Sequence, residues 1–74
     1  MIGSIPQATD ILPGAQIWRH GYLWRVDRVI HDKYGNDGKT PRIVFAVTCL
    51  APIPAGYQHI ELGYLPHATV SVQL

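Results

Sequence analysis

Charged side chains are scarce in this chain of 74 residues, of which Asp, Glu, Lys and Arg make up only 15%. Typical soluble domains carry about 25%, whereas the apolar share of 47% is ordinary. A surface so short of charge favours association with a second copy or with a stable partner. The formal net charge is +1, which excludes a strong field that would attract phosphate or membrane lipid.

Cysteine is almost absent, and the single Cys49 excludes an internal disulfide. A chain of this length buries only about 60% of its unfolded surface, so its stability is marginal without a staple or a partner. Because Cys49 lies in an apolar stretch without a cationic neighbour in sequence, we interpret it as a small buried hydrophobe. This sparing use of cysteine fits a reducing compartment, and we expect a cytoplasmic protein.

Long apolar runs are also missing, since no stretch approaches the roughly 20 residues of a membrane span. The first ten residues, MIGSIPQATD, have neither a basic segment nor a continuous apolar core. We therefore expect no signal peptide and no membrane partner. At this length the chain makes one domain.

Metal and cofactor motifs are absent from the sequence. The four histidines stand at positions 20, 31, 59 and 67, and no two of them are closer than eight positions. Zinc sites favour much tighter pairs, and no glycine-rich phosphate loop or nucleophile motif is present. We expect no metal and no cofactor.

The chain begins with a segment that we interpret as an N-terminal arm, residues 1–13. Pro6, Pro13 and the Gly3-Ser4 pair interrupt regular structure. Four aliphatic residues make it too apolar for a free tail: Ile2, Ile5, Ile11 and Leu12. The arm docks either on its own domain or on a neighbouring molecule.

From Gly14 onwards the sequence predicts strands. Residues 15–20 and 22–27 alternate on either side of His20-Gly21, a pair suited to a tight turn. The period of two fails near Asp27-Arg28, which predicts a β-bulge. A helix over residues 23–31 is the alternative, but the β-branched and aromatic composition favours a strand.

The second half continues the pattern. The turn-forming run Gly35-Asn36-Asp37-Gly38 predicts the tip of a hairpin, and residues 42–50 follow as the central strand. A short strand around residues 59–62 and an alternating strand over residues 68–74 complete the series. Closely spaced strands with turns between them predict an all-β fold.

Gly21 lies between two predicted strands, and the second of them ends in Trp24-Arg25-Val26. This arrangement resembles the opening of KOW, Tudor and related SH3-like barrels. The resemblance covers residues 14–74 as an order of strands. It implies a small SH3-like β-barrel of about five strands after the arm. Those families generally bind nucleic acid, peptides or modified side chains, so the resemblance implies a non-enzymatic binding module and carries over no specific residue.

Aromatic and cationic side chains alternate over residues 18–28. Such a mixture suits stacking on bases beside contacts to phosphates, and the alternative is that the tryptophans are core and the arginines form solvated ion pairs. Our leading hypothesis is a nucleic-acid-binding accessory protein of phage or mobile-element type. Its predicted binding face consists of Trp18, Arg19, Tyr22, Arg25 and Arg28.

Residues 42–50 pose a question of coverage, because both faces of this strand are mostly apolar. Ile43, Phe45, Val47 and Cys49 alternate with Val44, Ala46, Thr48 and Leu50. Either the strand bends so that core and arm cover both faces, or a second copy covers one. We favour the second copy, which predicts a homo-oligomer. In that alternative function, a protein-interaction or assembly subunit, the interface is formed by Val44, Ala46, Thr48 and Leu50.

A third hypothesis is a tiny oligomeric enzyme whose site lies between subunits. The ending Val72-Gln73-Leu74 is similar to the valine-glutamine-isoleucine-tyrosine motif of the small plasmid-borne dihydrofolate reductases. The tyrosine of that motif has no counterpart here. No catalytic residue is carried over from this resemblance.

Overall fold

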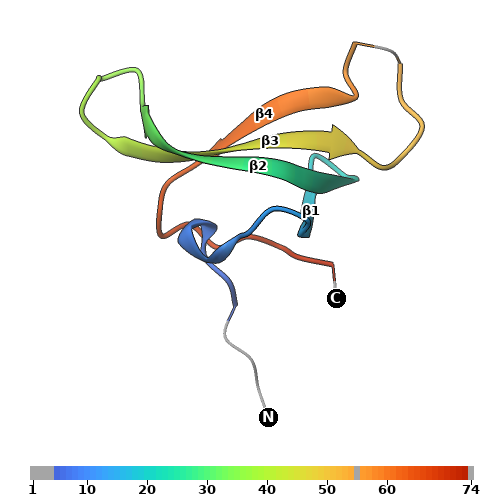
Figure 1. The fold of residues 1–74 in the computed structure, drawn as a ribbon, viewed down its shortest axis with the longest axis horizontal. Coiled ribbons are helices and arrows are strands. Elements are labelled where there is room, and N and C mark those ends of the chain that lie inside the picture. Colours follow the sequence, from blue (N-terminus) through green and yellow to red (C-terminus); the bar gives the residue numbers. More distant parts are fainter. Residues whose placement is uncertain (1–4, 55, 74) are drawn as a thin grey trace.

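The computed structural model describes residues 5–54 and 56–73, which form one antiparallel sheet and a single 3-10 turn. The sheet has four strands in the order β1-β2-β3-β4 (Figure 1). The elements are η1 (Ala8–Asp10), β1 (Gln16–Arg19), β2 (Tyr22–Tyr34), β3 (Pro41–Cys49) and β4 (His59–Tyr64). The predicted all-β class is confirmed. None of the described residues belongs to a helix long and apolar enough to cross a membrane.

The β1–β2 hairpin turns at His20 and Gly21, whose φ angles are 56° and 80°. Two successive positive φ angles suit the right-handed twist of the flanking strands, and glycine adopts one of them without steric cost. The turn predicted from sequence is confirmed. It sets the register in which Ile17 faces Trp24 and Trp18 faces Leu23.

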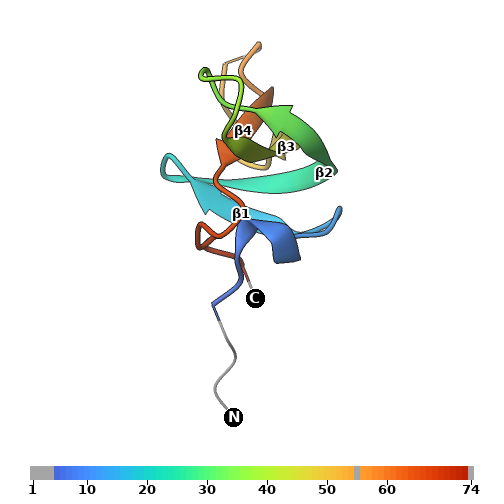
Figure 2. The same cartoon turned by 90° about the vertical axis from the view of Figure 1, so that its left-hand side faces the viewer.

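Strand β2 is long and irregular, and it pairs along most of its length with β3. The register shifts between Val26 and Arg28, where the sequence predicts a bulge, and again between Ile30 and Lys33. The strand assignment is confirmed over the helical alternative. Each shift bends the strand, and the sheet curls over one of its faces (Figure 2).

The β2–β3 tip is held by Asp37. Its Oδ1 accepts hydrogen bonds from the amides of Lys39 and Thr40, both at 2.9 Å. The Thr40 hydroxyl and these amides lower the pKa of Asp37 to about 2. The predicted hairpin loop is therefore confirmed, with a side-chain turn at its tip.

The core lies on one side of the sheet, here called the inner face. Phe45 and Ile17 are fully buried there, and Phe45 packs against Tyr64 with ring centroids 5.2 Å apart. The other buried strand residues are Trp24, Val26, Ile43, Val47, Cys49 and Leu62. Cys49 is 7% exposed, which confirms its interpretation as a buried hydrophobe. The opposite side of the sheet is the outer face.

The described part of the arm docks on its own domain. Ala8 N–H donates to the Ala68 carbonyl, and Val70 N–H donates to the Pro6 carbonyl, both at 2.9 Å. Ala8 and Val70 are almost fully buried as a result. In Figure 1, η1 and the C-terminal segment run together below the sheet. Ile2 of the predicted arm lies outside the described residues.

The predicted C-terminal strand is reduced to two isolated bridges, Gln7 with Thr69 and Ile17 with Val72. The segment still lies along β1, because Trp18 N–H donates to the Ser71 carbonyl and Gln73 N–H donates to Gln16. Its alternation follows the prediction, with Val70 buried between exposed neighbours.

The prediction of a closed five-stranded barrel is wrong in its closure. The sheet has β1 and β4 as its outermost strands, and β4 pairs only with β3 among the described residues. After β4 the chain turns at Leu65, whose carbonyl accepts from Ala68 N–H. This turn carries the C-terminal segment across to β1. The segment therefore does not pair with the free side of β4.

Candidate functional site

The register divides the predicted nucleic-acid face between the two sides of the sheet. Residues that are directly paired share a face. Gln16 pairs with Arg25 and Trp18 with Leu23, on the outer face, whereas Arg19 pairs with Tyr22 on the inner face. Beyond the bulge Arg28 pairs with Ala46 and returns to the outer face. The structure therefore places Trp18, Arg25 and Arg28 on one face of the sheet, and it places Arg19 and Tyr22 on the other.

Arg25 is held in a polar network on the outer face. Its Nε donates to Asp27 Oδ1 at 2.9 Å, and the Thr48 hydroxyl lies between Asp27 Oδ2 and His59 Nδ1. The hydrogen bond from Thr48, followed by that from Arg25, lowers the pKa of Asp27. A carboxylate so stabilised offsets the Arg25 charge, which reduces what Arg25 offers to a phosphate.

Two further predicted residues also have partners within the chain. Trp18 is 45% exposed, and its indole N–H donates to Gln73 Oε1 at 3.0 Å. The Arg19 guanidinium lies over the Tyr64 ring, 4.6 Å from its centroid. Trp18 thus keeps an exposed ring in a fixed orientation, while Arg19 is used in a contact on the inner face.

The predicted oligomer interface forms a continuous row along β3 on the outer face. Val44, Ala46 and Thr48 are half-buried, and Leu50 is 42% exposed. The partial burial comes from neighbouring strands, since Ala46 lies between Arg28 and Glu61. The second face of β3 is thus partly covered within one chain.

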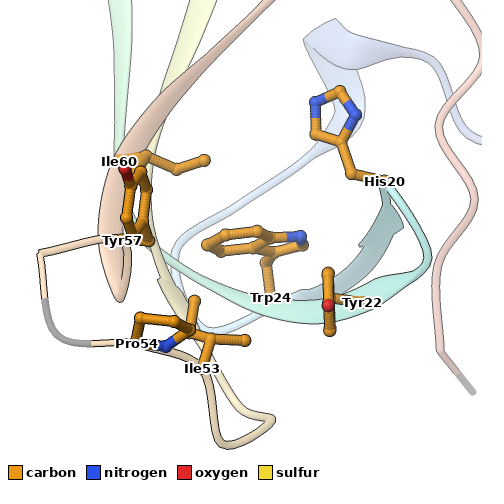
Figure 3. A pocket seen from close by; sticks show the side chains of 7 residues that line it. All are labelled: His20, Tyr22, Trp24, Ile53, Pro54, Tyr57 and Ile60. Atoms are coloured by element: carbon orange, nitrogen blue, oxygen red, sulfur yellow. The ribbon is translucent and has the colours of Figure 1, made fainter.

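A pocket at one end of the inner face gathers side chains from three parts of the chain. His20, Tyr22 and Trp24 come from the β1–β2 hairpin, Ile53, Pro54 and Tyr57 from the β3–β4 loop, and Ile60 from β4. These seven residues define the aromatic pocket, a hollow of about 290 Å³. Figure 3 shows Trp24 between the hairpin residues on one side and Tyr57 with Ile60 on the other.

Trp24 is the fixed part of the aromatic pocket. It is only 3% exposed, and its indole N–H donates to the Arg19 carbonyl at 2.9 Å. Since this is the only donor of an indole, the small part of the ring that is exposed in the pocket is apolar. Tyr22 at 43% and Tyr57 at 66% exposed stand at the rim. The lining has no Lys, Arg, Asp or Glu, so the pocket suits an apolar or aromatic group.

The sequence interpretation missed half of this pocket. The sequence predicts Tyr22 on a binding face, but it gives no predicted role to the loop residues between positions 50 and 59. The available signal was an apolar Ile53 between two prolines, followed by the aromatic Tyr57, in a loop between two predicted strands. Apolar loop residues of this kind are typical of a binding rim.

A second hollow lies on the outer face. Its lining includes Asp27, His59 and Glu61 beside Ala46. Within the described ranges, no three His, Cys, Asp or Glu side chains lie close enough together to hold a metal ion.

No family model, curated protein or solved structure matches this chain. The arrangement of its own residues is therefore what supports a functional assignment.

Proposed function

We propose that this chain is a non-enzymatic binding module that takes an apolar or aromatic side chain of a partner protein into the aromatic pocket. The observation that carries the proposal is the state of Trp24, a buried indole with its N–H already bonded. Exposed tyrosines on both sides complete a concave aromatic surface. Such surfaces recognise apolar and proline-rich segments of extended peptides.

A protein partner fits the pocket better than a nucleic acid does. Bases stack on aromatic rings, but the strand that carries them needs cations along its phosphates. The pocket lining has no lysine or arginine, and the chain has a net charge of only +1. Hydrophobic burial is the main attraction that this surface offers.

We also propose that the fold is related to SH3-like folds, and the strand arrangement supports this relationship. Four antiparallel strands follow one another in order, and the C-terminal segment bridges β1 through Ile17 and Val72. This is the strand order that the sequence resemblance implies. Peptide binding is among the functions general to those families.

Nucleic-acid binding is the second candidate, and it stays a prediction. The observation in its favour is that Trp18, Arg25 and Arg28 share the outer face. Self-assembly through the β3 row of the outer face also stays a prediction. Both are given tests in the Discussion.

Selection from a displayed library of random linear peptides tests the pocket. We expect the selected peptides to share an apolar or aromatic residue and to bind through Tyr57. Truncating an aromatic contact of this kind weakens binding by about tenfold or more, so Tyr57→Ala lowers affinity, measured by fluorescence anisotropy. Tyr34→Ala is the matched control, because Tyr34 is 62% exposed at the far end of β2.

Two outcomes contradict the proposal. One is a selection that enriches no peptide. The other is a set of enriched peptides that bind Tyr57→Ala and Tyr34→Ala with the affinity of the native chain.

A further inference from the structure

The backbone of β4 presents a free edge. Cys49 N–H donates to the Gln58 carbonyl at 2.7 Å, and the β3–β4 register runs without a shift from Thr48–His59 to Ile43–Tyr64. In an antiparallel pair, alternate residues direct their N–H and C=O toward the partner. Gln58, Ile60, Leu62 and Tyr64 therefore bond to β3, whereas the N–H and C=O groups of His59, Glu61 and Gly63 point away from it.

No described residue forms a hydrogen bond with these outward groups. The other outermost strand differs, because the C-terminal segment occupies the free side of β1 through Trp18 and Gln16. Figure 1 shows β4 at the outside of the sheet. Protected edges carry prolines, bulges or charged side chains, lysine above all. Strand β4, with the sequence HIELGY, has no proline, lysine or bulge, and Glu61 is its one acidic residue. This edge is therefore open to pairing with another strand.

The free edge adjoins the aromatic pocket. Ile60 belongs both to β4 and to the pocket lining. A residue paired with Ile60 on an added strand directs its side chain to the inner face, about 5 Å from Ile60, where the pocket opens. The next residue pairs with Glu61, which is exposed on the outer face, and a basic side chain there meets an opposite charge.

We infer that β4 accepts an extended segment of a partner protein by antiparallel strand addition. An apolar side chain of that segment enters the aromatic pocket, and basic side chains face the outer side opposite Glu61. This inference rests on the proposed function, because the pocket selects the apolar residue. Main-chain hydrogen bonds supply affinity, and the alternating pattern supplies specificity.

Two symmetric registers in which a second copy of the chain could pair with this edge are unfavourable. Symmetric pairing about Glu61 places two carboxylates directly opposite, which is destabilising. Pairing about Leu62 places Tyr64 of the second copy opposite Ile60, but that ring is held in its own core against Phe45 and under Arg19. Neither register fills the aromatic pocket.

The test uses the labelled peptide acetyl-Thr-Lys-Leu-Lys-Leu-Lys-Thr-amide and two N-methylated forms of it. In antiparallel addition the lysines pair with the outward residues of β4, so their N–H groups bond to the protein. We expect N-methylation of the lysine amides to weaken binding by about tenfold or more, because each lost hydrogen bond contributes about 1 kcal/mol. N-methylation of the leucine amides leaves the affinity nearly unchanged.

Charge is tested with the matching peptide in which glutamate replaces every lysine. We expect the native chain to prefer the lysine peptide and Glu61→Lys to prefer the glutamate peptide. Glu61→Lys changes an exposed side chain, so the fold is retained, and far-ultraviolet circular dichroism checks this. An unchanged preference contradicts the predicted position of the basic side chains.

The two proposals fail in different ways. If Tyr57→Ala binds the parent peptide as well as the native chain does, the aromatic pocket is not the site and the proposed function is wrong. If Tyr57→Ala loses binding but both N-methylated peptides bind like the parent, the pocket stands and strand addition is wrong. No binding of the parent peptide also overturns strand addition. Displacement of the labelled peptide as the protein self-associates overturns the choice of a partner segment over a second copy.

Discussion

The guanidinium of Arg19 lies over the ring of Tyr64, 4.6 Å from the ring centroid, and so joins the two outermost strands of the sheet. Tyr64 in turn packs against Phe45 in the core. The Arg19 carbonyl accepts the indole N–H of Trp24. One residue of β1 therefore orients the buried ring of the aromatic pocket and contacts the strand whose edge we propose as a docking site.

Replacing Arg19 with alanine tests this connection. A cation over an aromatic ring contributes about 0.5–1 kcal/mol at partly exposed sites, so we expect Arg19→Ala to lower the free energy of unfolding by about that amount. Urea denaturation followed by tryptophan fluorescence measures the change. Arg28→Ala is the control, because Arg28 is exposed and surface changes of this kind stay within about 0.5 kcal/mol. Equal stability of the two variants would show that the Arg19–Tyr64 contact adds nothing.

Asp27 predicts a pH dependence of stability. Hydrogen bonds from Thr48 and Arg25 lower its pKa in the folded chain below the unfolded value of 3.8. The carboxylate is then favoured by folding, so its contribution is present above pH 3.8 and is lost as the pH falls through the lower, folded pKa. We expect Asp27→Asn to be less stable than the native chain at pH 7 and to converge with it in strong acid. Urea denaturation at pH 7 and at the lowest pH that keeps the chain folded measures this. A difference in stability that does not shrink with acidification would contradict it.

Local features of the strands follow directly from the sequence. The His20-Gly21 turn needs positive φ angles, which Gly21 adopts readily, and the loss of period near Asp27 marks the first bulge of β2. The short strand after Tyr57 and the hairpin tip at Asp37 were likewise predictable. In each case a few neighbouring residues determine the local conformation.

The pocket and the open, unclosed sheet depend on distant residues, which explains why the sequence did not reveal them. The alternation of Trp18 with Arg19 and of Tyr22 with Leu23 gives two possible faces for each strand. Only the pairing of Arg19 with Tyr22 decides which residues share a face. Tyr57 reaches Trp24 because the β3–β4 loop folds back over the hairpin, and no local pattern encodes that path.

Self-assembly through the outer face has its own test. Val44 and Ala46 are half-buried in the single chain, so a second copy would complete their burial. We expect sedimentation of the native chain to show a dimer or a larger species, and we expect Val44→Glu to shift it toward the monomer, because a buried unpaired charge is costly. Lys33→Glu is the control, since Lys33 is exposed at the far end of β2. A native chain that sediments as a monomer at all concentrations rules out this interface.

Nucleic-acid binding through the outer face predicts a salt dependence that Arg25 and Arg28 carry. If Arg25 and Arg28 contact phosphates, affinity for a labelled mixed-sequence duplex falls steeply with salt. The double change Arg25→Ala with Arg28→Ala then reduces the slope of log affinity against log salt by about one per lost contact. Lys33→Ala with Lys39→Ala removes the same charge elsewhere and is the control.

The Arg25–Asp27 ion pair sharpens this test. Asp27 holds the Arg25 Nε at 2.9 Å, so Asp27→Asn releases the guanidinium and removes a negative charge beside it. A phosphate-binding Arg25 therefore predicts tighter duplex binding by Asp27→Asn, opposite in sign to the effect of Arg25→Ala. Anisotropy titrations at two salt concentrations measure both variants. A more positive net charge would strengthen duplex binding through any surface, so Asp37→Asn is the matched control variant. An equal gain in affinity for Asp27→Asn and Asp37→Asn would place the duplex away from Arg25.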